Sequence, residues 1–149
     1  MGLDCSHDAF HGAYSAFNRL RQEVCRATGG SFPPHWKWNS DGTYVENRGI
    51  PVRNKDLDED SWYFGEGYSE ESHPGLFGFL SHSDCDGEIP PEMCERVADE
   101  LEKLLPKIEA LASPAWGDIA YQGGYVPVLR KFIDGCRAAA AAGDPLKFA

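Results

Sequence analysis

The stretch His82-Ser83-Asp84-Cys85-Asp86-Gly87-Glu88-Ile89 lies between a short apolar run, residues 76–80, and the strongest predicted helix of the chain. The run follows Gly75 and is typical of a buried central strand. The stretch itself holds a histidine, two carboxylates, a thiol and a turn glycine. A strand that ends in polar side chains and leads into a helix is a common way to build a site. This stretch therefore decides both the predicted fold and the predicted site.

Three helices are predicted from apolar side chains that recur at three- and four-residue steps. They span residues 8–28, 90–111 and 125–142, and Pro106 should kink or split the second one. Glycines after the first and third segments suit helix ends. The apolar faces consist of Phe10, Ala13, Phe17, Leu20 and Val24; of Val97, Leu101, Leu104, Leu105, Ile108 and Leu111; and of Val128, Leu129, Phe132 and Cys136.

The remaining segments read as strands and loops. Residues 36–38 and 43–45 flank the turn sequence Asn39-Ser40-Asp41-Gly42, which predicts a hairpin. Residues 50–52 and 146–148 are candidate short strands, and 54–73 and 113–124 are predicted loops, the first of them acidic. The sequence thus predicts one α+β domain over residues 1–149, with three main helices packed on a small, mostly antiparallel sheet.

Composition narrows the classes of partner. The chain has 149 residues and a net charge of −10, which opposes binding to nucleic acid. It has no apolar run near the roughly 20 residues of a membrane helix, and no secretory signal. The first six residues match a myristoylation pattern, but no basic patch follows them. Five cysteines without a C-x-x-C pair indicate reduced thiols and a cytoplasmic protein.

The predicted first helix has a second, polar stripe at the border of its apolar face. A helical wheel places six residues within about 40° of one line, roughly a quarter-turn from the apolar centre. Such a stripe is either the wall of a pocket or a solvated flank. Its members are His7, His11, Tyr14, Asn18, Arg21 and Cys25.

Two metal sites can be considered for the central stretch. Residues 84–89 resemble the middle of an EF-hand calcium loop, but position 1 of that loop would be His82 and position 12 would be Met93. Calcium needs six to eight oxygen ligands, which the stretch does not supply. The alternative is a divalent transition metal that activates water in a hydrolase. Its ligands would be His7, His11, His82, Asp84 and Asp86.

A third interpretation of the stretch needs no cofactor. Asp84 and Asp86 can accept hydrogen bonds from sugar hydroxyls or from the amino group of a base, while histidine and Arg21 hold a phosphate. The plainer alternative is that the two aspartates only form a turn before the next helix. In either case Gly87 is expected to have a positive φ.

The chain also resembles a family of small bacterial and phage proteins without an established activity. The resemblance rests on the opening Met1-Gly2-Leu3-Asp4-Cys5-Ser6-His7, on a first helix with Tyr14, Phe17, Arg19 and Arg21, on the 82–88 segment and on the tail, residues 132–148. It implies a bacterial or viral cytoplasm. By analogy with phage proteins that bind a host's signalling nucleotide or defence protein, it also favours a sequestering role.

The sequence therefore favours a non-catalytic binding protein for a small polar, nucleotide-like ligand, with no cofactor. The alternatives are the metal-assisted hydrolase and an acidic protein-binding module, such as an inhibitor of a host protein, that acts through residues 54–73. A homo-oligomer is compatible with each hypothesis. His7 and Asp84 are expected within about 10 Å of each other, a distance that a small ligand bridges. The predicted ligand-binding residues are His7, His11, Tyr14, Arg21, His82, Ser83, Asp84 and Asp86.

Overall fold

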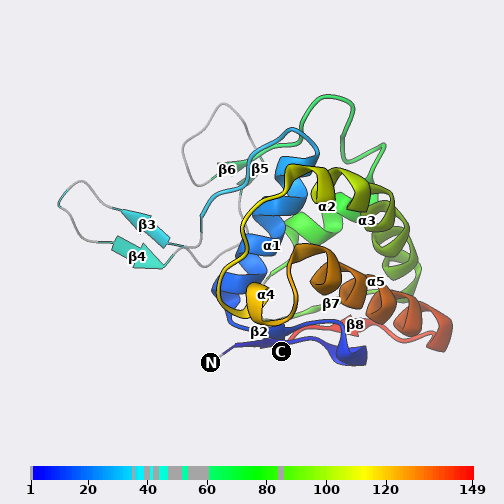
Figure 1. Ribbon diagram of the computed structural model, residues 1–149. Helices are drawn as coiled ribbons and strands as arrows, with labels where there is room; N and C mark the ends of the chain where they lie inside the picture. Colours follow the sequence, from blue (N-terminus) through cyan, green and yellow to red (C-terminus); the bar gives the residue numbers. More distant parts are fainter. Residues whose placement is uncertain are drawn as a thin grey trace.

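The computed structural model describes residues 2–34, 36–38, 41, 44–46, 52–53, 61–83 and 86–149. Helices form the body of the molecule and short strand pairs lie around it, so the class is α+β, as predicted (Figure 1). The elements in chain order are β1 (Leu3–Asp4), the 3-10 helix η1 (Ser6–Asp8), β2 (His11–Gly12), α1 (Tyr14–Ala27), β3 (Trp36–Trp38), β4 (Tyr44–Glu46), β5 (Val52–Arg53), β6 (Ser61–Trp62), α2 (Pro74–Ser81), β7 (Glu88–Ile89), α3 (Pro91–Leu111), α4 (Gly117–Tyr121), α5 (Tyr125–Ala142) and β8 (Leu146–Lys147).

Helix α3 is the centre of the fold, because it packs against α5, α2 and α1. It has the predicted bounds, and Pro106 does not split it. Its buried face, which includes Val97, Leu101 and Ile108, joins the buried faces of the other helices in one apolar cluster. No helix within the described residues combines the length and the apolar character needed to cross a membrane.

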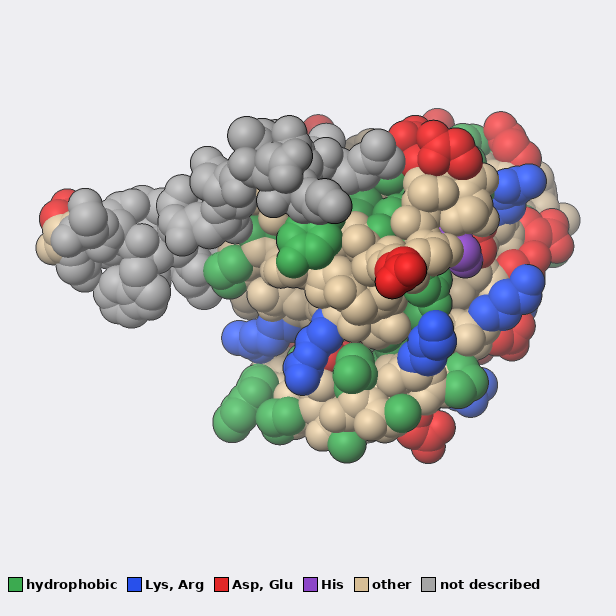
Figure 2. All heavy atoms as spheres, turned by 90° about the horizontal axis from the view of Figure 1, so that it is seen from above, with side chains coloured by type: hydrophobic (Ala, Val, Ile, Leu, Met, Phe, Trp, Pro, Cys, Tyr) green, Lys and Arg blue, Asp and Glu red, His purple; other side chains and the backbone are tan. Residues whose placement is uncertain are grey.

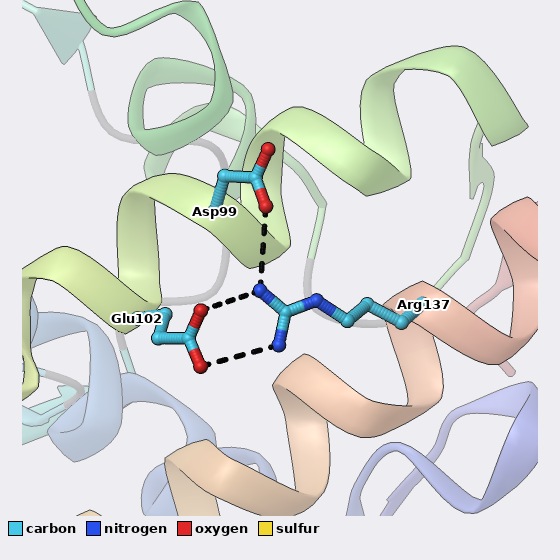
Figure 3. Close-up of polar contacts among 3 residues, drawn as sticks. All are labelled: Asp99, Glu102 and Arg137. Atoms are coloured by element: carbon cyan, nitrogen blue, oxygen red, sulfur yellow. Dashed lines mark hydrogen bonds and ion pairs between the residues drawn. The ribbon is translucent and has the colours of Figure 1, made fainter.

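An ion-pair cluster joins α3 and α5 on their solvent side (Figure 3). The Arg137 guanidinium of α5 lies between two carboxylates of α3, with Nη2 at 2.6 Å from Glu102 Oε2 and 3.3 Å from Asp99 Oδ1. The hydrogen bond and the charge of Arg137 lower the pKa of Glu102. Because all three side chains reach solvent, this cluster stabilises the helix pair far less than the apolar contacts beneath it do.

Helix α1 begins at Tyr14 rather than at residue 8, which corrects the prediction. His7 and Asp8 have φ values of 55° and 57°, which an α-helix does not accommodate, and the residues before α1 instead form the β1–β2 pair around η1. The start of α1 is capped by a residue that is distant in the sequence, because the Ala13 N–H donates to Asp118 Oδ2 at 2.7 Å. The predicted apolar face of the helix proper is buried as expected.

The apolar run 76–80 lies in helix α2, so the prediction of a central strand was wrong. Pro74 occupies the first turn, where proline suits a helix. The carboxylate of Glu100 on α3 accepts the N–H groups of Gly75 and Leu76 at 3.1 and 3.0 Å, and thus pairs two of the donors that a helix start leaves open. Gly75 allows this approach, since a Cβ there would lie 2.6 Å from the Arg96 backbone.

The described strands form four separate pairs instead of the one small sheet that was predicted. The β1–β2, β3–β4 and β7–β8 pairs are antiparallel, whereas β5–β6 is parallel. The predicted hairpin is confirmed as β3–β4, with Lys37 opposite Val45. The predicted strand 50–52 overlaps β5 only at Val52. Within these residues the helices therefore pack on one another rather than on a sheet.

The two predicted loops contain regular structure of their own. Residues 113–124 include the short helix α4. In the predicted acidic loop, Trp62 lies in β6 and is fully buried against Phe64 and Phe77, while residues 54–60 lie outside the described ones. The predicted edge strand is confirmed as β8, which pairs with β7. Asp4 and Ala149 exchange two backbone hydrogen bonds of 3.0 Å, so the chain ends lie together (Figure 1).

Candidate functional site

Two predicted site residues, Arg21 and His82, meet in the interior. The Arg21 side chain lies over the Phe17 ring, 4.6 Å from its centroid, and Nη2 donates to the His82 carbonyl at 2.5 Å. His82 follows the last turn of α2, where helix carbonyls lack partners and favour a positive charge. The His82 ring packs on Phe148 at 4.2 Å, and its Nδ1 lies 2.7 Å from the Ser83 carbonyl. This geometry joins α1, α2 and the chain end.

The two histidines of the opening segment do not lie one helical turn apart, because no helix contains both. His7 Nε2 lies 3.5 Å from Asp144 Oδ2. His11 is an exposed residue of β2, and its Nδ1 lies 3.4 Å from Asp4 Oδ1. Each ring thus faces a carboxylate near the surface, which is the arrangement of local ion pairs. The four-residue spacing of His7 and His11 supports a shared metal site only if both lie on one α-helix, and they do not.

The other predicted residues are spread over different parts of the structure. Tyr14 begins α1 and packs against the core, Ser83 is half-buried, and Asp86 is exposed. Asp84 lies outside the described residues, as does Cys85, so its approach to His7 stays a prediction. Gly87 has a φ of 87°, which confirms the expected turn conformation.

The described residues contain no group of three His, Cys, Asp or Glu side chains that could hold a metal ion. Because Asp84 lies outside the described residues, the metal-assisted hydrolase stays a prediction. The protein-binding module also stays a prediction, since the most acidic part of its segment, residues 54–60, is outside the described ones.

A cavity of about 440 Å³ lies beside the second half of α1, within the volume range of small-molecule sites. The segment between α3 and α4 forms one wall, the residues that follow α1 form another, and Tyr125 at the start of α5 completes it. None of the predicted site residues that the structure describes lines this cavity. Its lining consists of Arg19, Gln22, Glu23, Arg26, Gly30, Ser31, Phe32, Ser113, Pro114, Trp116 and Tyr125.

Glu23 is the unusual member of this lining, because it is a carboxylate that is only 4% exposed. Its Oε1 accepts a hydrogen bond from Ser113 Oγ at 3.0 Å and lies 3.8 Å from Arg26 Nη1. Its Oε2 is buried and has no hydrogen-bond partner among the described residues. Buried polar atoms are nearly always paired, so an unpartnered acceptor in the lining of a cavity needs a donor that the described residues do not provide.

Two cations and two aromatic side chains are prominent in the rest of the cavity lining. Arg26 is exposed, and Arg19 is half-exposed with no carboxylate partner in the described part of the chain. Trp116 is 63% exposed, which is rare for so large an apolar side chain. Burial and then the Glu23 charge raise the pKa of Tyr125, and both arginines oppose this rise. Tyr125, Glu23, Arg19 and Arg26 therefore share one electrostatic environment.

The net charge of −10 does not describe every part of the surface. Figure 2 shows Lys and Arg side chains in a band below the middle of one face, whereas most Asp and Glu side chains on that face lie toward its upper and right edges. Such separation lets an acidic protein attract an anion locally. Arg19 and Arg26 supply positive charge at the cavity in spite of the overall charge.

A second cavity, of about 340 Å³, lies between α3 and residues 68–73. Several of its polar groups already have partners within the protein. Glu100 caps α2, Asp99 pairs with Arg137, and the Tyr68 hydroxyl accepts a hydrogen bond from Lys107. Because these groups are occupied, this cavity gives a weaker indication of a ligand than the cavity at Glu23 does.

Comparisons with protein-family models, with curated proteins and with solved structures find no match.

No sequence pattern singles out Glu23 or Trp116. Glu23 lies outside the apolar face of α1, and its burial depends on Ser113, 90 positions further along the chain. Trp116 stands in a segment that was predicted as a plain loop. On a helical wheel Arg19 and Arg26 lie opposite the apolar face of α1, which agrees with their exposure but does not indicate a cavity beside them.

Proposed function

We propose that this protein binds a small anionic ligand with a flat ring, of nucleotide-like chemistry, in the cavity beside α1. The proposal concerns binding and includes no reaction step. The observation that carries it is the joint placement of Arg19, Arg26 and Trp116 around one cavity of about 440 Å³. The proposed ligand class is the one favoured by the sequence, but the proposed site is different.

The lining supplies the two kinds of contact that such a ligand needs. Guanidinium groups bind phosphate through planar, paired hydrogen bonds, and Arg19 is not engaged with any carboxylate in the described residues. An exposed indole offers a flat apolar surface on which a base can stack, and Trp116 keeps 63% of its surface accessible. Both side chains are available without any rearrangement of the core.

The biological setting of the proposal comes from the sequence. The resemblance of residues 1–7 and 82–88 to small bacterial and phage proteins supports a role in sequestering a nucleotide-like compound of the host cytoplasm. Sequestration requires only tight binding, which suits a site built from charged, aromatic and hydrogen-bonding side chains. This part of the proposal rests on analogy.

The test is calorimetric titration of the full chain with AMP, GMP, CMP, UMP and inorganic phosphate at low salt. At least one mononucleotide should bind, and Arg19→Gln and Trp116→Ala should each weaken it at least tenfold. Tyr121→Ala is the matched control, because Tyr121 is 93% exposed and does not line the cavity. Failure of every mononucleotide to bind, or equal binding by all variants, would contradict the proposal.

A further inference from the structure

We infer that Glu23 selects ligands whose ring carries an amino group, through a hydrogen bond from that group to Glu23 Oε2. The inference rests on the proposed function and names a specificity-determining residue within the same cavity. Glu23 lines the cavity, is 4% exposed, and has one carboxylate oxygen without a partner among the described residues. A donor brought by the ligand would pair the atom that the fold leaves open.

The surroundings of Glu23 favour a neutral donor over a cation. Arg26 Nη1 lies 3.8 Å from Glu23 Oε1, and Arg19 also acts electrostatically on the cavity. A metal ion or a second ammonium group would have to approach these positive charges, and a single carboxylate is too few ligands for a hard cation. The N–H of a ring amino group donates to a carboxylate without adding charge, as in the recognition of cytosine by acidic side chains.

The exposures of the lining residues orient the ligand. The side chain of Glu23 is 4% exposed and that of Arg26 is 63% exposed, so the acceptor is deep and the cation is at the rim. Trp116 and Tyr125 also line the cavity and offer ring surfaces. A nucleotide would therefore enter with its base toward Glu23 and leave its phosphate at the arginines. A base with a carbonyl in place of the amino group would place its oxygen next to Glu23 Oε2, so that two hydrogen-bond acceptors would face each other.

This selection is tested by calorimetry of the full chain with three ligand pairs. GMP and IMP differ only in the 2-amino group. In AMP against IMP and in CMP against UMP, a carbonyl replaces the amino group and the neighbouring ring nitrogen gains a proton. In at least one pair the amino-bearing nucleotide should bind at least tenfold more tightly. A site built to accept a hydrogen bond rejects an analogue that lacks the donor by a large factor. This comparison needs only the wild-type chain.

Glu23→Gln provides the matched variant, because glutamine keeps the volume of glutamate and its amide can donate to a ring carbonyl. The affinity ratio of the selective pair should fall to about one or reverse, while the arginines still hold the phosphate. Equal affinities within all three pairs on the wild type would overturn the inference and leave the proposed function standing. A ratio that survives Glu23→Gln would also overturn it. Failure of every nucleotide to bind would overturn both.

Discussion

Arg21 and Glu23 stand two positions apart on α1, and each is almost completely buried, with 3% and 4% of its surface exposed. Their surroundings differ. Arg21 donates to the carbonyl at the end of α2 and lies over two phenylalanine rings, so its charge is used to hold elements together. Glu23 keeps one oxygen without a partner in the described residues and lines a cavity.

The comparison shows that burial of a charge does not by itself indicate function. A buried charge that donates to the end of another helix and packs on aromatic rings contributes to stability, and its removal leaves a partner unsatisfied. A buried charge that the fold leaves partly open destabilises the free protein, and such a group is expected where a ligand completes it. The two residues should therefore respond in opposite ways to apolar substitution.

The largest effect is expected at Arg21. Arg21→Met keeps much of the side-chain length but leaves the His82 carbonyl without its donor, and should lower the free energy of unfolding by about 3 kcal/mol. Urea denaturation followed by circular dichroism measures this loss. Arg137→Met is the control, since Arg137 makes its ion pairs at the surface, and it should have a much smaller effect. Equal losses for the two variants would show that Arg21 has no special structural role.

A second effect concerns two buried thiols, those of Cys5 and Cys25. Burial and the Asp4 charge raise the pKa of Cys5 to about 12 against the opposing charge of Arg21, and burial raises the pKa of Cys25 to about 12. Above pH 9 the unfolded chain loses these protons while the folded chain keeps them, so stability falls as pH rises from 9 toward 12.

The two thiols together should lower the stability by about 2 kcal/mol between pH 9 and pH 10. Urea unfolding at both pH values, on the wild type and on the double variant Cys5→Ala/Cys25→Ala, measures the contribution as a difference. The same pH dependence in both proteins would mean that these thiols titrate alike in the folded and unfolded states.

Gly87→Ala tests the turn beside His82. An alanine at this position has to adopt a φ of 87°, and its Cβ would lie 3.3 Å from the His82 ring. Thermal unfolding should therefore show a loss of about 1–2 kcal/mol in the free energy of unfolding. Gly67→Ala is the matched control, because its φ is 89° with no atom within 4 Å of the added Cβ. It should show the backbone strain alone, and a larger loss there than at Gly87 would contradict the packing against His82.

The smallest effect is expected at Glu23. Glu23→Leu removes a buried oxygen without a partner, and Ser113 and the exposed Arg26 can turn to water. The free energy of unfolding without ligand should stay the same or rise by about 1 kcal/mol, because an unpaired buried acceptor is lost. A clear loss of stability on urea denaturation would place Glu23 with Arg21 as a structural residue.

Local patterns predicted the parts of the fold whose determinants are local. Helices α3 and α5 follow from apolar periodicity, and the β3–β4 hairpin follows from its turn residues. The run 76–80 was misassigned because a short apolar segment suits a buried strand and a buried helix equally, and the groups that settle the choice, such as Glu100, lie on α3.

The same reasoning explains the result for the candidate site. Arg21 and His82 were selected for their residue types, and the structure places them together. The cavity could not be predicted, because Glu23 becomes buried only when Ser113 reaches it from beyond α3. His7 and His11 were grouped by a helical spacing that the positive φ values at residues 7 and 8 rule out. Contacts between distant segments decided the first two of these cases, and the local backbone decided the third.

The pairing of Asp4 with Ala149 also has a consequence for the order of folding during synthesis. Residues 4 and 5 leave the ribosome well before their backbone partners, residues 148 and 149, which follow the β7–β8 pair. Most contacts of the helical core lie within residues that emerge before these partners. The segment around Cys5, which is bridged to Phe148, must wait until residue 149 has emerged. In a growing polypeptide, this ladder would therefore form after the helical core.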